Sequence, residues 1–247
     1  MDADFYKKAA EVEATHWWFE GRRQLFLRTL RDIGVTDVSA ILDIGCSTGN
    51  NMRMLKSAGF SNYMGLDYSA IAVEFCRSAG LGNVEQGDAL HLPFEDDTFE
   101  LALLTDVIEH LDDDSAAIAE ACRVVKPGGH VLVTVPAFPS LWSVTDVNAH
   151  HKRRYRQNNL LQTITSSGLA IDRFYHFNFL LFLPIWLFRK INNAAGMAVK
   201  DELNANNAVL NRVLNSIFAL DTWLAERIRP NFGVSILALG RVPTKSA

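Results

Sequence analysis

The middle of the chain alternates short apolar runs with helix-like segments. Apolar runs lie at residues 40–44, 63–66, 101–105 and 131–135, with a weaker run at 83–86. Between them, segments 50–58, 70–79 and 115–125 predict helices, and Pro127, Gly128 and Gly129 provide a stop signal after the last one. Apolar runs this short favour strands that are buried on both faces. The alternation therefore predicts an α/β fold with a doubly wound, mostly parallel sheet.

The pattern changes after residue 136. A helical stretch is predicted at 157–167, a strand at 170–177, an apolar segment at 179–191 and a strand-like run at 234–239. Before that last run, apolar residues recur three and four positions apart and predict one apolar face of a long helix: Leu210, Val213, Leu214, Ile217, Leu220, Leu224 and Ile228. We therefore expect a helical insertion before the last strand.

We expect one domain made of five parts. These parts are an N-terminal helical cap (1–38), a ligand-binding core (39–136), a loop with a helix and a strand (137–178), the helical insertion (179–231), and the last strand with the tail (232–247).

The net charge of −4 hides an uneven distribution. Residues 40–136 hold 15 acidic and 5 basic side chains, a net charge of −10, which leaves the flanks at +6 with all five Trp. Three cysteines without C-x-x-C spacing predict neither a disulfide framework nor a zinc site. The N-terminus lacks the apolar core of a signal peptide, and no uncharged stretch reaches the roughly 20 residues of a membrane span. We expect a cytoplasmic protein.

A turn of small residues follows the first apolar run. Asp43 lies in this run, and Gly45, Cys46, Ser47 and Gly49 follow it before a helix begins. Such a turn lets backbone N–H groups approach a ligand closely, because no bulky side chain blocks them. A tight turn with a purely structural role is the alternative.

Carboxylates at the ends of the next two strands favour ligand binding. Asp67 follows Gly49 by 18 residues and would reach the hydroxyls of a ribose, although it could instead cap the next helix. Asp88, followed by Ala89, ends the third strand and suits the amino group of a base. Together with Asp43 these acids predict a nucleoside site, and their charge favours a cationic cofactor over a phosphate-rich one.

Residues 39–136 resemble the class I S-adenosylmethionine-dependent methyltransferases, in the segments 43–49, 67–68, 87–89, 105–111 and 125–129. The resemblance implies a Rossmann-like, seven-stranded sheet whose last strand is antiparallel, with S-adenosylmethionine as the cofactor. It also implies that Asp67 binds the ribose, Asp88 the adenine amino group and Tyr68 the adenine ring. Thr105 or Asp106 would then lie beside the methionine end.

Two features complicate this assignment. Ser47 stands where the family usually has a second glycine, and it could restrict the loop. Residues 45–49 also match the G-x-S-x-G turn of α/β hydrolases, but that turn normally follows several strands and here it follows the first.

Methyl transfer mainly requires alignment of the reactants, so we expect no metal. A base is needed only where the acceptor loses a proton, and His110 and His151 are the candidate catalytic residues. His110 could instead be a structural residue at the start of a helix.

Two motifs resemble a subgroup of these methyltransferases that accompanies glycosyltransferases. They are H-W-W-F at residues 16–19 and H-x-R-R-Y at 151–155. The resemblance implies an acceptor with carboxylate, phosphate or sugar groups, held by Arg153, Arg154 and Tyr155. Trp18 is a further candidate substrate-binding residue. Trp17 and Trp18 could close over the cofactor, or instead pack the N-terminal helix onto the sheet.

Segment 174–191, which ends in Arg189 and Lys190, has three interpretations. It packs into the core with the 210–228 stripe, lines a pocket for a lipidic acceptor, or contacts the inner face of a membrane with its basic end at anionic headgroups. We therefore expect a methyltransferase, acting on a hydroxyl of a hydrophobic, lipid-linked or glycan-type small molecule and not on nucleic acid. Transfer to an amine is a less favoured alternative, and a protein that binds the cofactor without catalysis is another.

Overall fold

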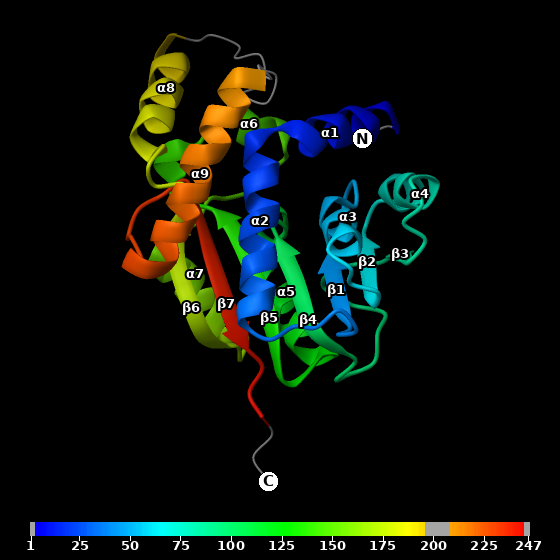
Figure 1. The fold of residues 1–247 in the computed structure, drawn as a ribbon. Coiled ribbons are helices and arrows are strands. Elements are labelled where there is room, and N and C mark those ends of the chain that lie inside the picture. Colours follow the sequence, from blue (N-terminus) through cyan, green and yellow to red (C-terminus); the bar gives the residue numbers. More distant parts are fainter. Residues whose placement is uncertain (1–2, 196–207, 245–247) are drawn as a thin grey trace.

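The computed structural model describes residues 3–195 and 208–244 and places a mixed sheet of seven strands at its centre (Figure 1). The strand order is β3-β2-β1-β4-β5-β7-β6, and β7 is antiparallel to both of its neighbours. The strands are β1 (Ile41–Ile44), β2 (Tyr63–Asp67), β3 (Val84–Gln86), β4 (Phe99–Thr105), β5 (Val125–Pro136), β6 (Ala170–Phe177) and β7 (Ser235–Arg241). The predicted fold class is confirmed.

Helices cover both faces of this sheet. They are α1 (Ala3–Thr15), α2 (Trp17–Asp32), α3 (Asn50–Ser57), α4 (Ala70–Ser78), α5 (Asp114–Val124), α6 (Val144–Asn148), α7 (Gln157–Ser166), α8 (Phe182–Ala195) and α9 (Ala208–Ile228), with short 3₁₀ helices η1 (Ile108–His110) and η2 (Pro139–Leu141). Side chains of β4 alternate between the faces: Leu101 and Leu103 pack with α2 and α9, whereas Ala102 and Leu104 pack with α5 and α7. This period of two explains why a strand buried on both faces is continuously apolar.

The Pro-Gly-Gly segment after α5 differs from the prediction. Helix α5 ends at Val124 as expected, but β5 begins at once, at Val125, and includes this segment. The pairing of β4 with β5 shifts register between Phe99 and Leu101, which marks a bulge. A side chain at Gly129 would lie 2.7 Å from the Glu100 carbonyl oxygen, so glycine permits this irregular start of the strand.

Helix α9 buries a different face from the predicted one. Its buried residues are Phe218, Asp221, Thr222 and Ala225, whereas several residues of the predicted apolar stripe are exposed: Leu210, Val213, Leu220 and Ile228. The interpretation that the whole stripe packs into the core is therefore wrong, although Leu214, Ile217 and Leu224 are half-buried. Residues 196–207 of the predicted insertion lie outside the described residues.

Two contacts explain the orientation of α9. The ring of Phe218 packs against Trp17 and Trp18 at centroid distances of 5.5 and 5.2 Å, and Gly21 of α2 leaves room for it. The carboxylate of Asp221 accepts hydrogen bonds from the backbone N–H groups of Asn178 (2.6 Å) and Leu180 (2.7 Å). Because these groups fix the turn between β6 and α8, α9 must turn its polar Asp221 inward and its apolar stripe outward.

Candidate functional site

The turn between β1 and α3 approaches its neighbours closely. The backbone N–H groups of Gly45 and Cys46 donate to the carbonyl of Leu66 at 2.7 and 3.0 Å. Gly45 has φ of 72°, and an added Cβ would lie 2.6 Å from Val107. Ser47 has φ of 49°, in the left-handed region that favours glycine. The predicted small-residue turn is present, and Ser47 accepts a conformation that glycine adopts more easily.

Asp67, at the end of β2, joins this turn to the start of α4. Its carboxylate accepts hydrogen bonds from the N–H groups of Ser47 and Ser69, each at 2.8 Å. Burial raises the pKa of Asp67, and these two hydrogen bonds oppose that shift. The N-cap of α4 is Ser69, whose hydroxyl accepts from Ala72, so capping by Asp67 itself is not needed. Asp67 thus holds both loops of the predicted nucleoside site.

The other predicted nucleoside contacts lie at the same edge of the sheet. Strand β3 pairs with β2 so that Gln86 is opposite Asp67, which places Asp88 just beyond this edge. The carboxylate of Asp88 accepts the N–H of Leu90 at 2.9 Å. Ala89 is buried, whereas the Tyr68 side chain is 76% exposed and free to lie over a ligand.

Asp43 of β1 is a buried carboxylate beside the turn. One oxygen accepts the Asn51 side-chain amide at 2.9 Å, and the other has no hydrogen-bond partner within the described residues. Burial raises the pKa of Asp43 to about 7. The Asn51 amide also donates to Thr105 at 2.9 Å, which connects Asp43 to the end of β4. A cationic ligand would satisfy this partly unpaired carboxyl group.

A cavity of about 170 Å³ lies above the turn, between the sheet edge and the N-terminal helices. It is lined by Glu13, Phe19, Arg22, Arg23, Phe26, Gly45, Cys46, Ser47, Thr48, Asn50, Asn51, Thr105 and Asp106. Arg22 forms an ion pair with Asp106 and donates to Thr134 at 3.1 Å. The cavity therefore carries both signs of charge, as the sulfonium, ammonium and carboxylate groups of S-adenosylmethionine require.

Two residues of this lining, Glu13 and Phe19, were not among the predicted site residues. Glu13 and Phe19 come from α1 and α2, and the carboxylate of Glu13 accepts a hydrogen bond from the Thr48 hydroxyl. The H-W-W-F motif was the available signal, because Phe19 is its last residue. The Trp18 side chain does not line the cavity. Its ring stacks on the Phe177 ring, with the ring centroids 5.9 Å apart.

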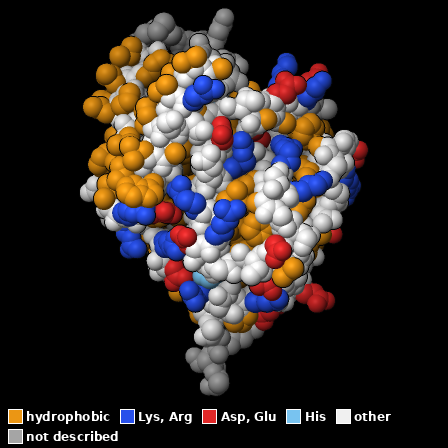
Figure 2. Space-filling view, in the orientation of Figure 1, with side chains coloured by type: hydrophobic (Ala, Val, Ile, Leu, Met, Phe, Trp, Pro, Cys, Tyr) orange, Lys and Arg blue, Asp and Glu red, His pale blue; other side chains and the backbone are white. Residues whose placement is uncertain are grey.

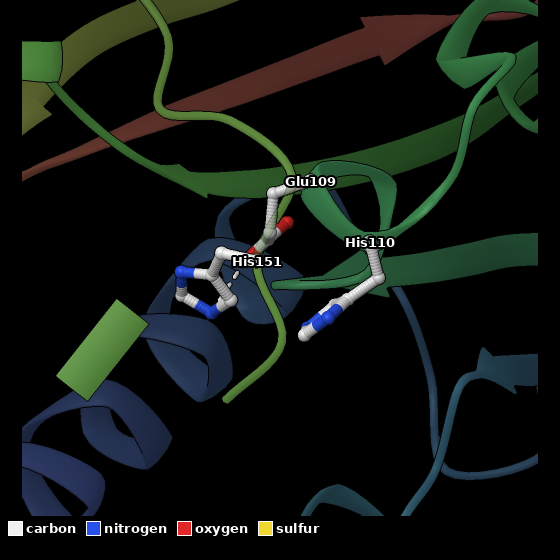
Figure 3. A group of neighbouring side chains, drawn as sticks. All are labelled: Glu109, His110 and His151. Carbon is white, nitrogen blue, oxygen red and sulfur yellow. Dashed lines mark ion pairs between the residues drawn. The ribbon is translucent and has the colours of Figure 1, made fainter. Parts of the chain in front are cut away.

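The two candidate catalytic histidines lie side by side (Figure 3). The rings of His110 and His151 are 4.8 Å apart and nearly perpendicular. Nδ1 of His151 is 2.8 Å from a carboxylate oxygen of Asp146. Burial, followed by the nearby His151, lowers the pKa of His110. Burial raises the pKa of Asp146, but hydrogen bonds from His151 and Arg154 outweigh it and hold this pKa at about 2. The Asp146 carboxylate therefore orients His151.

The predicted acceptor-binding residues make contacts within the protein. Arg154 is buried and donates to Asp146 at 2.7 Å and to the Ala137 carbonyl at 3.1 Å. The Tyr155 hydroxyl donates to Asp114 at 2.7 Å, and this residue is only 3% exposed. Arg153 donates to the carbonyl of Leu111 at 2.8 Å. These bonds hold the loop after α6 against η1; acceptor binding by these residues stays a prediction.

Residues 42–133 match the family model described as "Methyltransferase domain". The demethylmenaquinone methyltransferase of Staphylococcus aureus (strain JH9) is 30% identical over 138 residues, which are 51% of this chain and 57% of that protein. The chain thus spans little more than half the length of the curated relative that it matches.

Solved structures share the fold over most of the chain. Geranyl diphosphate methyltransferase in complex with SAM has a TM-score of 0.58 at 19% identity and covers 86% of this chain and 82% of that one. The [4+2]-cyclase SpnF has a TM-score of 0.60 at 20% identity and covers 92% of this chain and 83% of that one. At these identities the likeness shows the fold alone. The chain is thus similar to a methyltransferase domain over residues 42–133 and shares the fold of solved methyltransferase structures.

Proposed function

We propose that this protein transfers the methyl group of S-adenosylmethionine to a hydroxyl group of a hydrophobic acceptor. The observation that carries the proposal is the hydrogen-bonded pair of His151 and Asp146, which contacts His110, four residues after Asp106 of the cofactor cavity. With its Nδ1 bonded to Asp146, His151 keeps Nε2 available to accept a proton from an acceptor hydroxyl. Lipid-linked and glycan-type acceptors both carry such hydroxyl groups.

The relatives and the surface support a lipid-like acceptor. The name of the relative states that it methylates demethylmenaquinone, which is a quinone. In this chain, exposed apolar residues gather over α8 and α9 (Figure 2): Leu183, Leu187, Phe188 and Ile191 on α8, and Val209, Leu210, Val213, Leu220 and Trp223 on α9. We name these nine residues the α8–α9 surface. Such a surface favours an apolar acceptor over a fully hydrated sugar.

Cofactor binding is the first test. S-adenosylhomocysteine should raise the melting temperature, and Asp67→Asn should weaken its affinity by about 100-fold, because hydrogen bonds to a charged group contribute about 1.5–3 kcal/mol each. Glu85→Gln, which changes an exposed acid of β3 beside this edge, is the matched control. Unchanged affinity in Asp67→Asn would show that Asp67 does not bind the ribose.

Turnover is the second test. Candidate acceptors are incubated with S-adenosylmethionine, and release of S-adenosylhomocysteine is measured for the wild type and for His151→Gln. We expect release with an apolar alcohol or phenol, and a loss of at least 100-fold in kcat for His151→Gln. Binding without turnover for every acceptor would favour the non-catalytic alternative. A hydrolase would instead lose its activity in Ser47→Ala.

The α8–α9 surface also supports contact with an anionic membrane. Exposed cations accompany it at Lys190, Arg212 and Arg227, which suits acidic headgroups. The predicted headgroup contact of Arg189 is wrong, because this side chain is buried and donates to the Leu141 carbonyl at 2.8 Å. No helix among the described residues is both long and apolar enough to cross a bilayer. We therefore propose peripheral contact.

Vesicle sedimentation tests this contact. The wild type should sediment with phosphatidylglycerol vesicles, and the double variant Leu183→Gln/Leu187→Gln should bind them at least 10-fold more weakly, because each leucine contributes about 1.5–3 kcal/mol on burial. Val38→Gln is the control, since Val38 is 68% exposed and lies before β1, away from α8 and α9. Equal sedimentation of the double variant would refute the proposal. Dimers without vesicle binding would instead assign this surface to a second copy of the chain.

A further inference from the structure

Three side chains that can bind a metal converge at η1 (Figure 3). Glu109 and His110 come from η1, and His151 comes from the loop after α6. One ligand atom from each residue lies within 4.8 Å of the other two. Two imidazoles and one carboxylate form a donor set that binds first-row divalent ions.

The Glu109 side chain points into this group and has no hydrogen-bond partner within the described residues. The residue is fully buried, and neither carboxyl oxygen has a hydrogen bond within the described residues. The nearest charged partner is Nε2 of His151, at 3.9 Å. Burial and the neighbouring Asp106 carboxylate raise the pKa of Glu109 well above its usual range. A buried carboxyl group with two unpaired oxygens requires an explanation, and a bound cation would provide one.

Asp146 gives His151 the orientation of a metal ligand. It is fully buried and accepts from Nδ1 of His151 at 2.8 Å, which leaves the lone pair of Nε2 directed toward Glu109. Histidine ligands of metals commonly donate their other nitrogen to a carboxylate in this way. Arg154 and the backbone N–H of Ser143 in turn hold Asp146, at 2.7 and 2.8 Å. The H-x-R-R-Y motif thus positions the metal ligand.

We propose that Glu109, His110 and His151 bind one divalent transition-metal ion. Two nitrogen donors favour Zn²⁺, Co²⁺, Mn²⁺ or Fe²⁺ over Mg²⁺ and Ca²⁺. At metal–ligand distances of about 2.1 Å, tetrahedral ligands lie about 3.4 Å apart. The ligand atoms of the three residues lie within 4.8 Å of one another, so small movements of the side chains would bring them to these distances.

The ion would retain open coordination positions toward the acceptor. Asp106, which lines the cofactor cavity, directly follows β4, and three residues separate it from His110. With the ion bound, Nε2 of His151 would be a ligand and no longer the base, and an acceptor hydroxyl bound to the ion would instead lose its proton to solvent more readily. This catalytic role depends on the proposed methyl transfer, whereas metal binding itself does not. This proposal departs from the expectation of no metal, since the order of residues along the chain does not show that His151 lies beside His110.

Titration with Co²⁺ tests the site without cofactor or acceptor. The chelator-treated full chain should bind one equivalent and show the visible absorption of cobalt with nitrogen ligands, and Zn²⁺ should displace it. Glu109→Gln and His151→Gln should each lower the affinity at least 10-fold. His150→Gln is the matched control for His151, because it removes an exposed imidazole from the adjacent position.

The thermal stability of Glu109→Gln separates metal binding from folding. Glutamine is nearly isosteric with a protonated glutamic acid, so the metal-free variant should melt within a few degrees of the wild type. Zn²⁺ should raise the melting temperature of the wild type and not that of the variant. If the wild type binds no Co²⁺ above the level of Glu109→Gln, the proposal is wrong. S-adenosylhomocysteine binding, measured without metal, would still test the methyltransferase proposal separately.

Discussion

The edge of the sheet that carries Asp43, Asp67 and Asp88, called here the cofactor edge, and the α8–α9 surface differ in the kind of group that each places in an unfavourable environment. At the sheet edge, the carboxyl group of Asp43 is buried with one oxygen that has no hydrogen bond within the described residues, and the carboxyl group of Asp67 is half-buried. On α8 and α9, leucine and tryptophan side chains face outward. Each arrangement is unfavourable in isolation, because buried charges lose hydration and exposed hydrocarbon orders water.

The buried carboxyl groups and the exposed apolar side chains indicate two different kinds of ligand. Buried acids gain from a cationic ligand, and an exposed apolar surface gains from lipid or another apolar partner. Both arrangements are maintained by well-formed contacts nearby: Asp67 binds two loops, and Asp221 fixes the turn before α8. The stability of each region therefore depends on a few specific residues, and substitutions can separate these from the ligand-facing ones.

The largest expected difference in the free energy of unfolding is between two variants of α9. Phe218 is fully buried, whereas Leu220, two positions away, is 52% exposed. Phe218→Ala should lower the free energy of unfolding by about 3–5 kcal/mol, because a cavity forms between α9 and α2. Leu220→Ala should change it by less than about 0.5 kcal/mol. Urea denaturation measures both, and similar losses for the two variants would mean that the α8–α9 surface is part of the core.

The variant Asp43→Asn tests how the buried Asp43 carboxyl group changes the pH dependence of the free energy of unfolding. The pKa of Asp43 rises from 3.8 in the unfolded chain to about 7 in the folded one. Between these values the unfolded chain releases the proton and the folded chain keeps it, so the free energy of unfolding decreases as pH rises. The full shift corresponds to about 4 kcal/mol.

The variant should remove this loss of stability. Relative to the wild type, Asp43→Asn should gain stability between pH 5 and pH 8, measured by urea denaturation at both values. Asp37→Asn, at an exposed position, is the control. An identical pH dependence in the wild type and Asp43→Asn would show that Asp43 is ionised in the folded protein.

Gly21→Ala tests the contact that orients α9. Alanine favours helices by about 1 kcal/mol over glycine, but its Cβ would collide with the Phe218 ring. We expect a net loss of about 2 kcal/mol in the free energy of unfolding. The double variant Gly21→Ala/Phe218→Leu should lose less than the sum of the single variants, because the smaller side chain removes the collision. Additive losses would contradict this explanation.

The two regions also differ in how well the sequence predicts them. At the cofactor edge, short apolar runs end in glycine or aspartate, so one pattern locates both the strand and the edge at which Asp67 and Asp88 lie. On α9, the 3.6-residue period correctly predicts a helix but not the face that it buries. That face depends on Gly21 and on the backbone of Asn178, which are distant in sequence. The contact of His110 with His151 is likewise set by tertiary structure.

The smallest effect concerns the role of the H-x-R-R-Y motif. Tyr155→Phe removes the hydrogen bond to Asp114, and the carboxylate then retains its contact with Arg153 at 3.2 Å. We expect a loss of about 1.5 kcal/mol in the free energy of unfolding, with no change in KM for the acceptor. Tyr68→Phe, whose hydroxyl belongs to an exposed side chain, should change stability by less than about 0.5 kcal/mol. If Tyr155→Phe instead raises KM and leaves stability unchanged, the motif binds the acceptor directly, as the resemblance to glycan-pathway methyltransferases implies.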